Sequence, residues 1–240
     1  MNSYQSKKVK IDIKNISKSY DDVKVLEDIS IKVLEGEFVS ILGPSGCGKS
    51  TIFNIVASLT DCSSGSIDIN GRLSYMYQKD LLLPYKTIID NVSLPLILKN
   101  TKKNNAYEKV KSYFKVFGLE GYENKYPSEL SGGMKQRANF LRTFINSNDI
   151  MLLDEPFGAL DSITKTSMQK WLLDVKNKVN ATILLITHDI DEAIMLSDRI
   201  YVISNKPSKV KSEVVVDKDF YNEDKLENIA NLKKEIIKLL

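Results

Sequence analysis

Several kinds of residue are scarce in this chain, and each scarcity excludes a class of protein. Two of the 240 residues are cysteines, and Cys47 and Cys62 have neither the spacing of a zinc site nor that of a disulfide framework. Only four of the 34 basic residues are arginines, and the lysines are scattered along the chain. Proteins that bind nucleic acids usually concentrate positive charge and favour arginine, so we expect no nucleic-acid partner.

Long hydrophobic runs are also missing. No apolar stretch approaches the ~20 residues that a membrane-spanning helix needs. Residues 1–8 lack the apolar segment of a signal peptide, so we expect none. Two unpaired cysteines fit a reducing compartment. We therefore expect a cytoplasmic protein that is soluble or attached to a membrane surface.

The chain has enough hydrophobic sequence for one full core, since 42% of its residues are hydrophobic and its net charge is only +3. Nearly continuous apolar runs at residues 38–42, 150–153 and 182–186 are typical of strands covered on both faces. Helical patterns separate these runs. The alternation predicts an α/β fold with a mostly parallel central sheet.

Further patterns predict how the rest of the chain is arranged. Apolar and polar side chains alternate over residues 9–13 and again over residues 23–33, which predicts an antiparallel β edge. Asn70-Gly71 predicts a hairpin turn between the strands on either side of it. Residues 87–146 are helical in pattern. From Leu226 onward, apolar residues recur at near-helical spacing, and we expect a tail helix that packs on its own domain, with a helix that binds a partner as the alternative.

A glycine-rich loop follows the first buried run. It reads Gly43-Pro44-Ser45-Gly46-Cys47-Gly48-Lys49-Ser50-Thr51 and satisfies the P-loop pattern G-x-x-x-x-G-K-[ST] between a strand and a helix. The glycines let backbone N–H groups point at phosphates. Lys49 would neutralise the β- and γ-phosphates, and the Ser50 hydroxyl would bind Mg²⁺. The loop therefore predicts ATP and Mg²⁺ as ligands.

A second glycine turn, Leu-Ser-Gly-Gly-Met-Lys-Gln-Arg at residues 130–137, also opens a predicted helix. Such a turn offers free backbone N–H groups to an anion. Two phosphate-binding turns in one small domain need an explanation. We favour a dimer in which the two kinds of turn meet across the interface and grip each ATP from both sides.

Polar residues also follow the other two buried runs. Asp154 and Glu155 end the second run, where the carboxyl ends of parallel strands bind ligands. Asp154 fits a carboxylate that holds Mg²⁺ through water, and Glu155 one that activates the attacking water. An Asp-Glu pair that only caps a helix is the alternative. His188, the only histidine, follows the third run, where an imidazole can contact the γ-phosphate or the water. A lone histidine without a function is the alternative there.

Taken in order, these motifs resemble the nucleotide-binding subunit of ATP-binding-cassette (ABC) transporters over nearly all of the chain. Gln78, with Leu-Leu-Leu-Pro-Tyr at residues 81–85, is similar to the Q-loop stretch of importers for nitrate, sulfonate, taurine and bicarbonate. Residues 153–161 and 187–193 resemble the same group. The resemblance implies an ATP-hydrolysing motor subunit of a membrane importer for a small anionic or organosulfur-like solute.

The resemblance also implies roles for individual residues. Tyr20 would stack on adenine, with a strand-end core tyrosine as the alternative. Gln78 would reach Mg²⁺ and the attacking water. The Ser131-Gly132-Gly133 turn would contact the γ-phosphate of the ATP held by the other subunit, and Asp161 would cross the dimer interface.

The same resemblance implies partners and a location. We expect a homodimer on ATP binding, and a transmembrane permease that docks on the Q-loop and the helical subdomain. An extracytoplasmic solute-binding protein would act indirectly. The subunit would then be cytoplasmic and peripheral, on the inner face of the cell membrane.

We expect a single ABC ATPase domain over residues 1–240. Residues 1–86 and 147–216 would form the RecA-like core with the antiparallel edge. Residues 87–146 would form the inserted helical subdomain, and residues 217–240 a C-terminal helical tail.

The chain departs from the family pattern in three places. The family usually has Ala-Arg-Ala after the signature helix starts, whereas this chain has Phe-Leu-Arg-Thr at residues 140–143. Only a few residues separate Gly71 from Gln78, so we expect a trimmed antiparallel edge. Tyr85 stands where the family usually has tryptophan. Two alternatives remain. A P-loop kinase for a small molecule would want an arginine-rich lid, and a non-transport ABC ATPase acting on DNA or ribosomes would carry a coiled-coil insertion or a second cassette.

Overall fold

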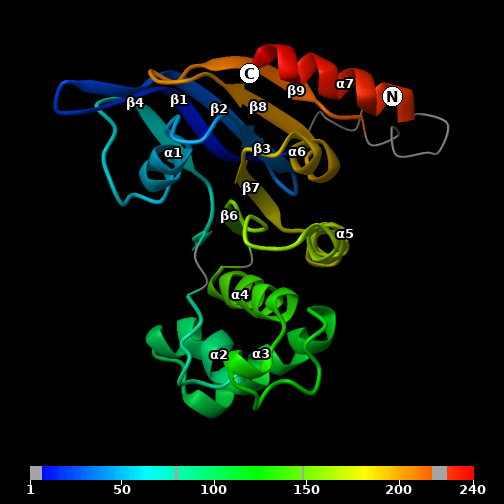
Figure 1. Cartoon of the computed structure of the whole chain (residues 1–240). Coiled ribbons are helices and arrows are strands. Elements are labelled where there is room, and N and C mark those ends of the chain that lie inside the picture. The colour runs from blue at the N-terminus through cyan, green and yellow to red at the C-terminus, as the bar shows by residue number, and fades with distance from the viewer. Residues whose placement is uncertain (1–6, 79–80, 148, 218–225) are drawn as a thin grey trace. The chain divides into compact units, whose positions relative to one another are not determined.

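The computed structural model describes residues 7–78, 81–147, 149–217 and 226–240 (Figure 1). Residues 1–6, on which much of the signal-peptide prediction depends, lie outside this set. The chain divides into two compact units. One joins Met1–Gly71 to Ala181–Leu240, and the other comprises Arg72–Asn180. The predicted helical subdomain, residues 87–146, falls within the second unit.

The first unit contains two sheets. In the smaller one, β1 lies between β2 and β4, and all pairs are antiparallel. In the other, β3 lies in parallel between β7 and β8, and β9 pairs antiparallel with β8. The elements of the unit are β1 (Val9–Tyr20), β2 (Val23–Leu34), β3 (Phe38–Leu42), α1 (Lys49–Val56), β4 (Ser64–Ile69), β7 (Thr182–Thr187), α6 (Ile190–Leu196), β8 (Arg199–Ile203), β9 (Val210–Val215) and α7 (Leu226–Leu239).

Burial explains why the two central strands read as continuous apolar runs. Every residue of β3 and of β7 is buried. A strand that is covered on both faces gains from apolar side chains at each position, so it shows no alternation. The mostly parallel arrangement predicted from these runs is confirmed.

The hairpin predicted at Asn70-Gly71 is wrong. β4 pairs antiparallel with β1, whereas β5 (Leu73–Met76) pairs in parallel with β6 (Ile150–Asp154). The Asn70 N–H donates to the Lys10 carbonyl over 2.8 Å, and its side-chain amide donates to the Val9 carbonyl over 3.1 Å. Asn70 therefore extends the ladder with β1 instead of turning the chain back on itself.

Strand β9 was not predicted. Val214 and Val216 are buried, whereas Glu213 and Val215 on either side of Val214 are exposed. This alternation of burial is typical of an edge strand with one solvated face. Because residues 214–216 are all valine, the sequence itself does not show the alternation.

The second unit consists of helices and one parallel strand pair. Aromatic rings pack in its core, where the Trp171 ring centroid lies 5.7 Å from that of Phe117 and 5.5 Å from that of Phe140. These edge-on contacts suit the ring quadrupoles. The elements of the unit are β5, α2 (Ile88–Leu98), α3 (Lys103–Val116), a 3₁₀ turn (Pro127–Glu129), α4 (Gly132–Asn146), β6 and α5 (Ser162–Val179).

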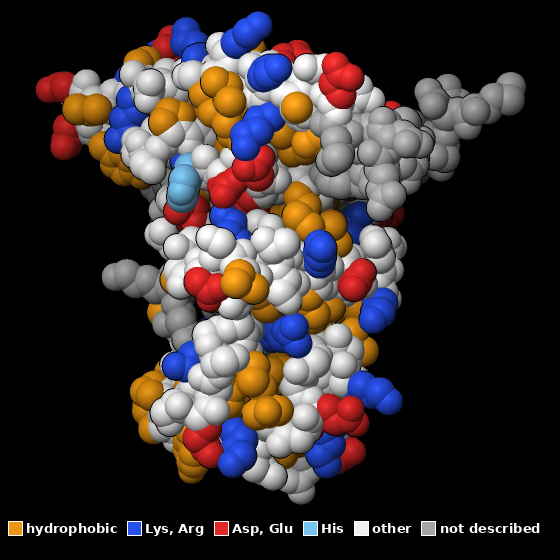
Figure 2. Space-filling view, turned by 45° about the vertical axis from the view of Figure 1, so that its right-hand side comes forward, with side chains coloured by type: hydrophobic (Ala, Val, Ile, Leu, Met, Phe, Trp, Pro, Cys, Tyr) orange, Lys and Arg blue, Asp and Glu red, His pale blue; other side chains and the backbone are white. Residues whose placement is uncertain are grey.

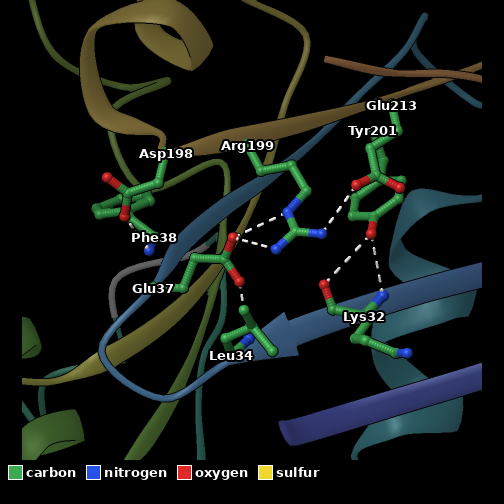
Figure 3. A network of polar contacts seen from close by, with 8 residues as sticks. All are labelled: Lys32, Leu34, Glu37, Phe38, Asp198, Arg199, Tyr201 and Glu213. Carbon is green, nitrogen blue, oxygen red and sulfur yellow. Dashed lines mark hydrogen bonds and ion pairs between the residues drawn. The ribbon is translucent and has the colours of Figure 1, made fainter. Parts of the chain in front are cut away.

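A polar network joins the starts of β3 and β8 in the first unit (Figure 3). Arg199 donates through Nε and Nη2 to Oε1 of Glu37 over 2.8 and 2.6 Å, and through Nη1 to Glu213 over 2.8 Å. Oε2 of Glu37 accepts from the Leu34 N–H over 2.7 Å. Because Glu37 is only 5% exposed, its charge depends on these partners. The network holds the amino ends of the strands and leaves their carboxyl ends to the loops that follow.

Candidate active site

The phosphate-loop candidate runs from the end of β3 to the start of α1. Gly48 has φ of 111°, a conformation that L side chains rarely adopt. A Cβ at this position would also lie 2.9 Å from Cγ1 of Val25. Conformation and space therefore both require glycine where the loop enters the helix.

Lys49 lies inside this loop. Its ammonium donates to the carbonyls of Gly43 and Pro44 over 2.7 and 2.9 Å, and the residue is 5% exposed. No side chain of the described residues caps α1, whereas Ser131 caps α4 and Asp161 caps α5. The positive end of the α1 dipole and its first N–H groups are thus left for an anion.

The remaining loop residues divide between exposed and buried. Ser45, Gly46 and Ser50 are exposed, and Thr51 is partly buried. Cys47 is buried, and burial raises the pKa of its thiol. It fills space in the loop and is not a reactive thiol.

His188 and the P-loop leave the same edge of the sheet. β3 and β7 are parallel neighbours in which Leu42 stands opposite Thr187. The loop begins one residue after Leu42 and His188 comes one residue after Thr187, as the sequence predicted. His188 is exposed and forms the pale blue surface in Figure 2. The following residue, Asp189, caps α6 by accepting from the Glu192 N–H over 3.1 Å.

Tyr20 is the last residue of β1 and is 45% exposed. The Lys18 ammonium lies 5.0 Å from its ring centroid. An exposed ring is not the core tyrosine that was the alternative, and it leaves a face on which a base can stack.

In the second unit, the structure brings Gln78 and Glu155 together. β5 and β6 run in parallel with Met76 opposite Leu153, so the residues after both strands leave one edge. The Gln78 side-chain amide donates to Oε2 of Glu155 over 3.1 Å. Two residues far apart in the sequence thus share a hydrogen bond at the place where water activation was predicted.

Glu155 has an unusual backbone. Its φ is 43°, in the left-handed region that non-glycine residues seldom occupy. Its carbonyl accepts from the Gly158 N–H over 3.2 Å, which closes a turn. Such conformations cost about 1–3 kcal/mol and gather at functional sites, because the surrounding structure must hold them in place.

Asp154 is buried beside a tyrosine that the sequence analysis did not single out. The Tyr75 hydroxyl donates to Oδ2 of Asp154 over 3.0 Å. Burial first, and then the Asp154 carboxylate, raise the pKa of Tyr75 well above its usual value. The hydroxyl therefore stays protonated and keeps donating. Only the alignment of β5 beside β6 brings this partner to Asp154.

The signature turn lies beside the start of α5. Ser131 caps α4, and its hydroxyl accepts from the Met134 N–H over 3.3 Å. A Cβ on Gly133 would lie 3.2 Å from Cγ2 of Thr164. Asp161 caps α5, and hydrogen bonds from Thr164 lower the pKa of its carboxyl. Small residues in the turn allow this close approach.

The predicted site residues therefore fall into two sets. The first unit carries Tyr20, the P-loop and His188, and the second carries Gln78, Asp154, Glu155, the signature turn and Asp161. In the first unit, strand register brings the P-loop and His188 to one edge of the sheet. In the second, a hydrogen bond joins Gln78 to Glu155, and the signature turn lies beside the start of α5. In the part of the chain that the structure describes, no helix has the length and hydrophobicity of a membrane span.

Comparisons with known proteins agree with this reading. Residues 26–158 match the family described as ABC transporter. The chain is 46% identical over 223 residues to the formylaminopyrimidine import ATP-binding protein ThiZ of Halalkalibacterium halodurans, covering 90% of each chain. It is 40% identical over 194 residues to the aliphatic sulfonates import ATP-binding protein SsuB of Bacillus subtilis, covering 78% of this chain and 75% of that protein.

Solved structures agree as well. The dimeric bacterial ABC transporter cassette MJ0796 is 31% identical with a TM-score of 0.73, covering 86% of this chain and 99% of that one. The fold also matches cbiO1 from Clostridium perfringens, at 23% identity and a TM-score of 0.80, over 95% and 97% of the two chains. With its sequence motifs, fold and relatives in agreement, this chain belongs to the ABC transporter family and is one of its ATP-hydrolysing subunits.

Proposed function

We propose that the chain drives the import of a small anionic or organosulfur-like solute, with a formylaminopyrimidine-like solute as the second candidate. The names of the SsuB and ThiZ relatives support these two classes. The observation that carries the catalytic part is the Gln78–Glu155 hydrogen bond at the end of the Asp154 strand. It holds a carboxylate where a water-activating base is needed.

In this proposal each residue has one task. Lys49 and the backbone N–H groups at the start of α1 bind the phosphates. Glu155 accepts a proton from the attacking water, and Gln78 orients its carboxylate. His188 contacts the γ-phosphate or that water. Tyr20 stacks on the adenine through its exposed ring.

The donor set suits Mg²⁺. This ion takes oxygen ligands and is usually held by one or two protein groups together with substrate phosphates. Ser50 offers an exposed hydroxyl, and Asp154 and Gln78 offer a carboxylate and an amide oxygen. When bound, Mg²⁺ would neutralise charge on the phosphates. The Tyr75 hydroxyl would orient Asp154 as a ligand.

We further propose that two copies complete each working site. Ser131, Gly132 and Gly133 of one copy would contact the γ-phosphate held by the P-loop of the other, and Asp161 would lie at the interface. The dimeric MJ0796 cassette supports this arrangement. Binding would close the dimer, because neither half alone satisfies the phosphate oxygens.

The permease would dock on an apolar groove in the second unit. The groove has a volume of about 380 Å³ and is lined by Tyr77, Leu81 and Leu98 and by the polar Lys99 and Arg142. Leu81 and Leu98 are exposed, which is typical of a protein interaction surface. Through the permease the subunit would lie on the inner face of the cell membrane, and a solute-binding protein would act outside.

Phosphate release tests the enzymatic proposal. We expect steady release of phosphate from ATP with water as the only acceptor. A kinase would turn over ATP at a comparable rate only with its acceptor substrate present. Ser131→Arg should abolish cooperative turnover and prevent dimers with Mg-ATP in gel filtration. Lys135→Arg, one turn along the same helix, should behave as wild type. Cooperative turnover by Ser131→Arg would refute the shared site.

The solute and the permease need a separate experiment. The subunit should be purified with its permease from membranes and reconstituted with candidate solutes. We expect a sulfonate or a formylaminopyrimidine to be taken up only with ATP inside. Uptake of neither, by an active complex, would refute both solute classes while leaving the ATPase proposal intact.

A further inference from the structure

The C-terminal helix α7 packs on a hydrophobic cluster whose members include residues next to the P-loop and in α6. Leu42, the residue before the P-loop, belongs to this cluster, and so do Ala193 and Ile194 of α6. Its other members are Ile200, Val202, Val214 and Val216 in and beside β8 and β9, and Leu232 and Ile236 of α7. The helix is therefore packed against the element that follows His188.

Packing on α7 is one-sided. Ile236 is fully buried, whereas the next residue, Ile237, is 53% exposed. Leu232 and Ile236 are spaced i, i+4 and so lie on one face of the helix. This face contacts the cluster, and the opposite face is solvated.

A charged contact fixes α7 to the first turn of α6. The Lys233 ammonium lies 2.7 Å from both carboxylate oxygens of Asp191. Asp191 follows His188 by three residues. The Lys233 and Asp191 side chains are 41% and 68% exposed, and pairs this exposed contribute little to stability. The contact joins the two helices close to His188, and its loss should leave the chain folded.

Helix α6 has only seven residues, fewer than a helix needs to persist by itself, so tertiary packing must set its direction. The P-loop has anchors of its own. The Ser208 hydroxyl donates to the Cys47 carbonyl, and Gly48 packs closely against Val25. A disturbance of α7 should then reach His188 more strongly than the phosphate loop.

We propose that α7 positions His188 through α6, and that Lys233 and Ile236 are positioning residues for ATP hydrolysis. The inference rests on the proposed role of His188. It assigns a task in the reaction to a tail helix that contributes no phosphate-binding or catalytic group.

The chain offers two matched pairs of variants for a kinetic test. Ile236→Ala and Lys233→Met should lower kcat by between about threefold and about 100-fold, since a shift near 1 Å in a catalytic group can have effects of that size. KM for ATP should stay nearly constant. Ile237→Ala and Lys234→Met change neighbouring exposed positions and should leave both constants unchanged. Lys233→Arg keeps the ion pair and should restore kcat.

The single histidine allows a direct measurement of its surroundings. In protein without a histidine tag, the imidazole Cε1–H signal in NMR spectra reports His188 alone. We expect Ile236→Ala and Lys233→Met to shift or broaden this signal, and Ile237→Ala and Lys234→Met to leave it in place. All assays are run well below the thermal unfolding midpoint of each variant, which is measured by circular dichroism. If Ile236→Ala does not fold, Lys233→Met, which alters only an exposed pair, carries the test.

The outcomes separate this inference from the proposed function. An unchanged His188 signal in Lys233→Met and Ile236→Ala overturns the inference, whatever happens to kcat. The inference is also overturned if the His188 signal moves in these two variants but their kcat stays at the wild-type value, while His188→Ala is inactive. If His188→Ala retains full turnover, the proposed role of His188 fails, and a moved signal still shows that α7 positions the residue.

Discussion

The Gln78 side-chain amide and the Glu155 carboxylate are joined by a 3.1 Å hydrogen bond in which Gln78 is the donor. Glu155 sits in a left-handed backbone conformation, and its carboxylate is oriented by a residue from the neighbouring strand end. A carboxylate held in this way is prepared to accept a proton from one direction. The first prediction follows from this pair.

Glu155→Gln should bind ATP with near wild-type affinity and lower turnover by at least about 100-fold, because general bases contribute factors of that order. The introduced amide oxygen can still accept from Gln78, so the shape of the pair is kept. Gel filtration should reveal a stable dimer with Mg-ATP, and phosphate release should measure turnover. Glu120→Gln, at an exposed position, is the control. Turnover above a tenth of the wild-type rate would contradict the assignment of Glu155 as base.

Tyr75→Phe should lower the affinity of the proposed site for Mg²⁺ without removing one of its ligands. Asp154 loses its 3.0 Å donor, and loss of such supporting contacts typically lowers metal affinity by about 10- to 100-fold. The Mg²⁺ concentration that gives half-maximal ATP turnover should therefore rise. Tyr77→Phe alters the ring stacked on Tyr75 at 4.1 Å and should leave the titration in place. Equal Mg²⁺ curves for wild type and Tyr75→Phe would show that Asp154 needs no such support.

Arg199→Met should destabilise the first unit by about 3–5 kcal/mol, because it leaves the buried Glu37 carboxylate without its ion-pair partner. Denaturant unfolding measures this loss. Lys209→Met breaks the more exposed pair with Glu27 and should cost less than about 1 kcal/mol. Adding Glu37→Gln to Arg199→Met should recover part of the loss, since no buried charge then remains. Additive effects of Arg199→Met and Glu37→Gln on the free energy of unfolding would argue against the network in Figure 3.

The environment of the Asp90 carboxyl predicts that the free energy of unfolding depends on pH in the acid range. Burial alone would raise the pKa of Asp90, but hydrogen bonds from Tyr107, Thr87 and Lys103 outweigh it and lower the pKa to about 2. A carboxyl whose pKa is lower in the folded state contributes stability above its unfolded pKa and loses it as the pH falls.

The advantage of wild type over Asp90→Asn should therefore be complete above pH ~4 and should disappear as the pH approaches about 2. Urea unfolding of both proteins at matched pH values measures the difference. Asp22→Asn, at an exposed position, should follow wild type throughout. A difference that stays constant down to pH ~2.5 would mean that the Asp90 carboxylate is not the titrating group.

The sequence was sufficient where structure follows from local pattern. The strands β3, β6 and β7 were predicted because strands covered on both faces are apolar at every position. The positions of the P-loop and of His188 on one sheet edge followed from the parallel arrangement. The packing of the tail helix on its own domain was also predicted, and Leu232 and Ile236 confirm it.

Prediction failed where the choice of partner lay far along the chain. Asn70-Gly71 has the composition of a hairpin turn, yet Asn70 bonds to β1 and the next strand pairs with β6. Turn propensity is a local preference, and the ladder hydrogen bonds of two competing strands outweigh it.

By itself the sequence determined the motifs, their order and the family, because phosphate binding needs particular residues at particular spacings that remain readable without coordinates. Tertiary structure alone decided that Tyr75 supports Asp154, that Gln78 orients Glu155, and that Lys233 reaches Asp191. Each of these contacts joins residues more than forty positions apart. Their meeting depends on strand register and helix packing over the whole unit, which no local pattern specifies.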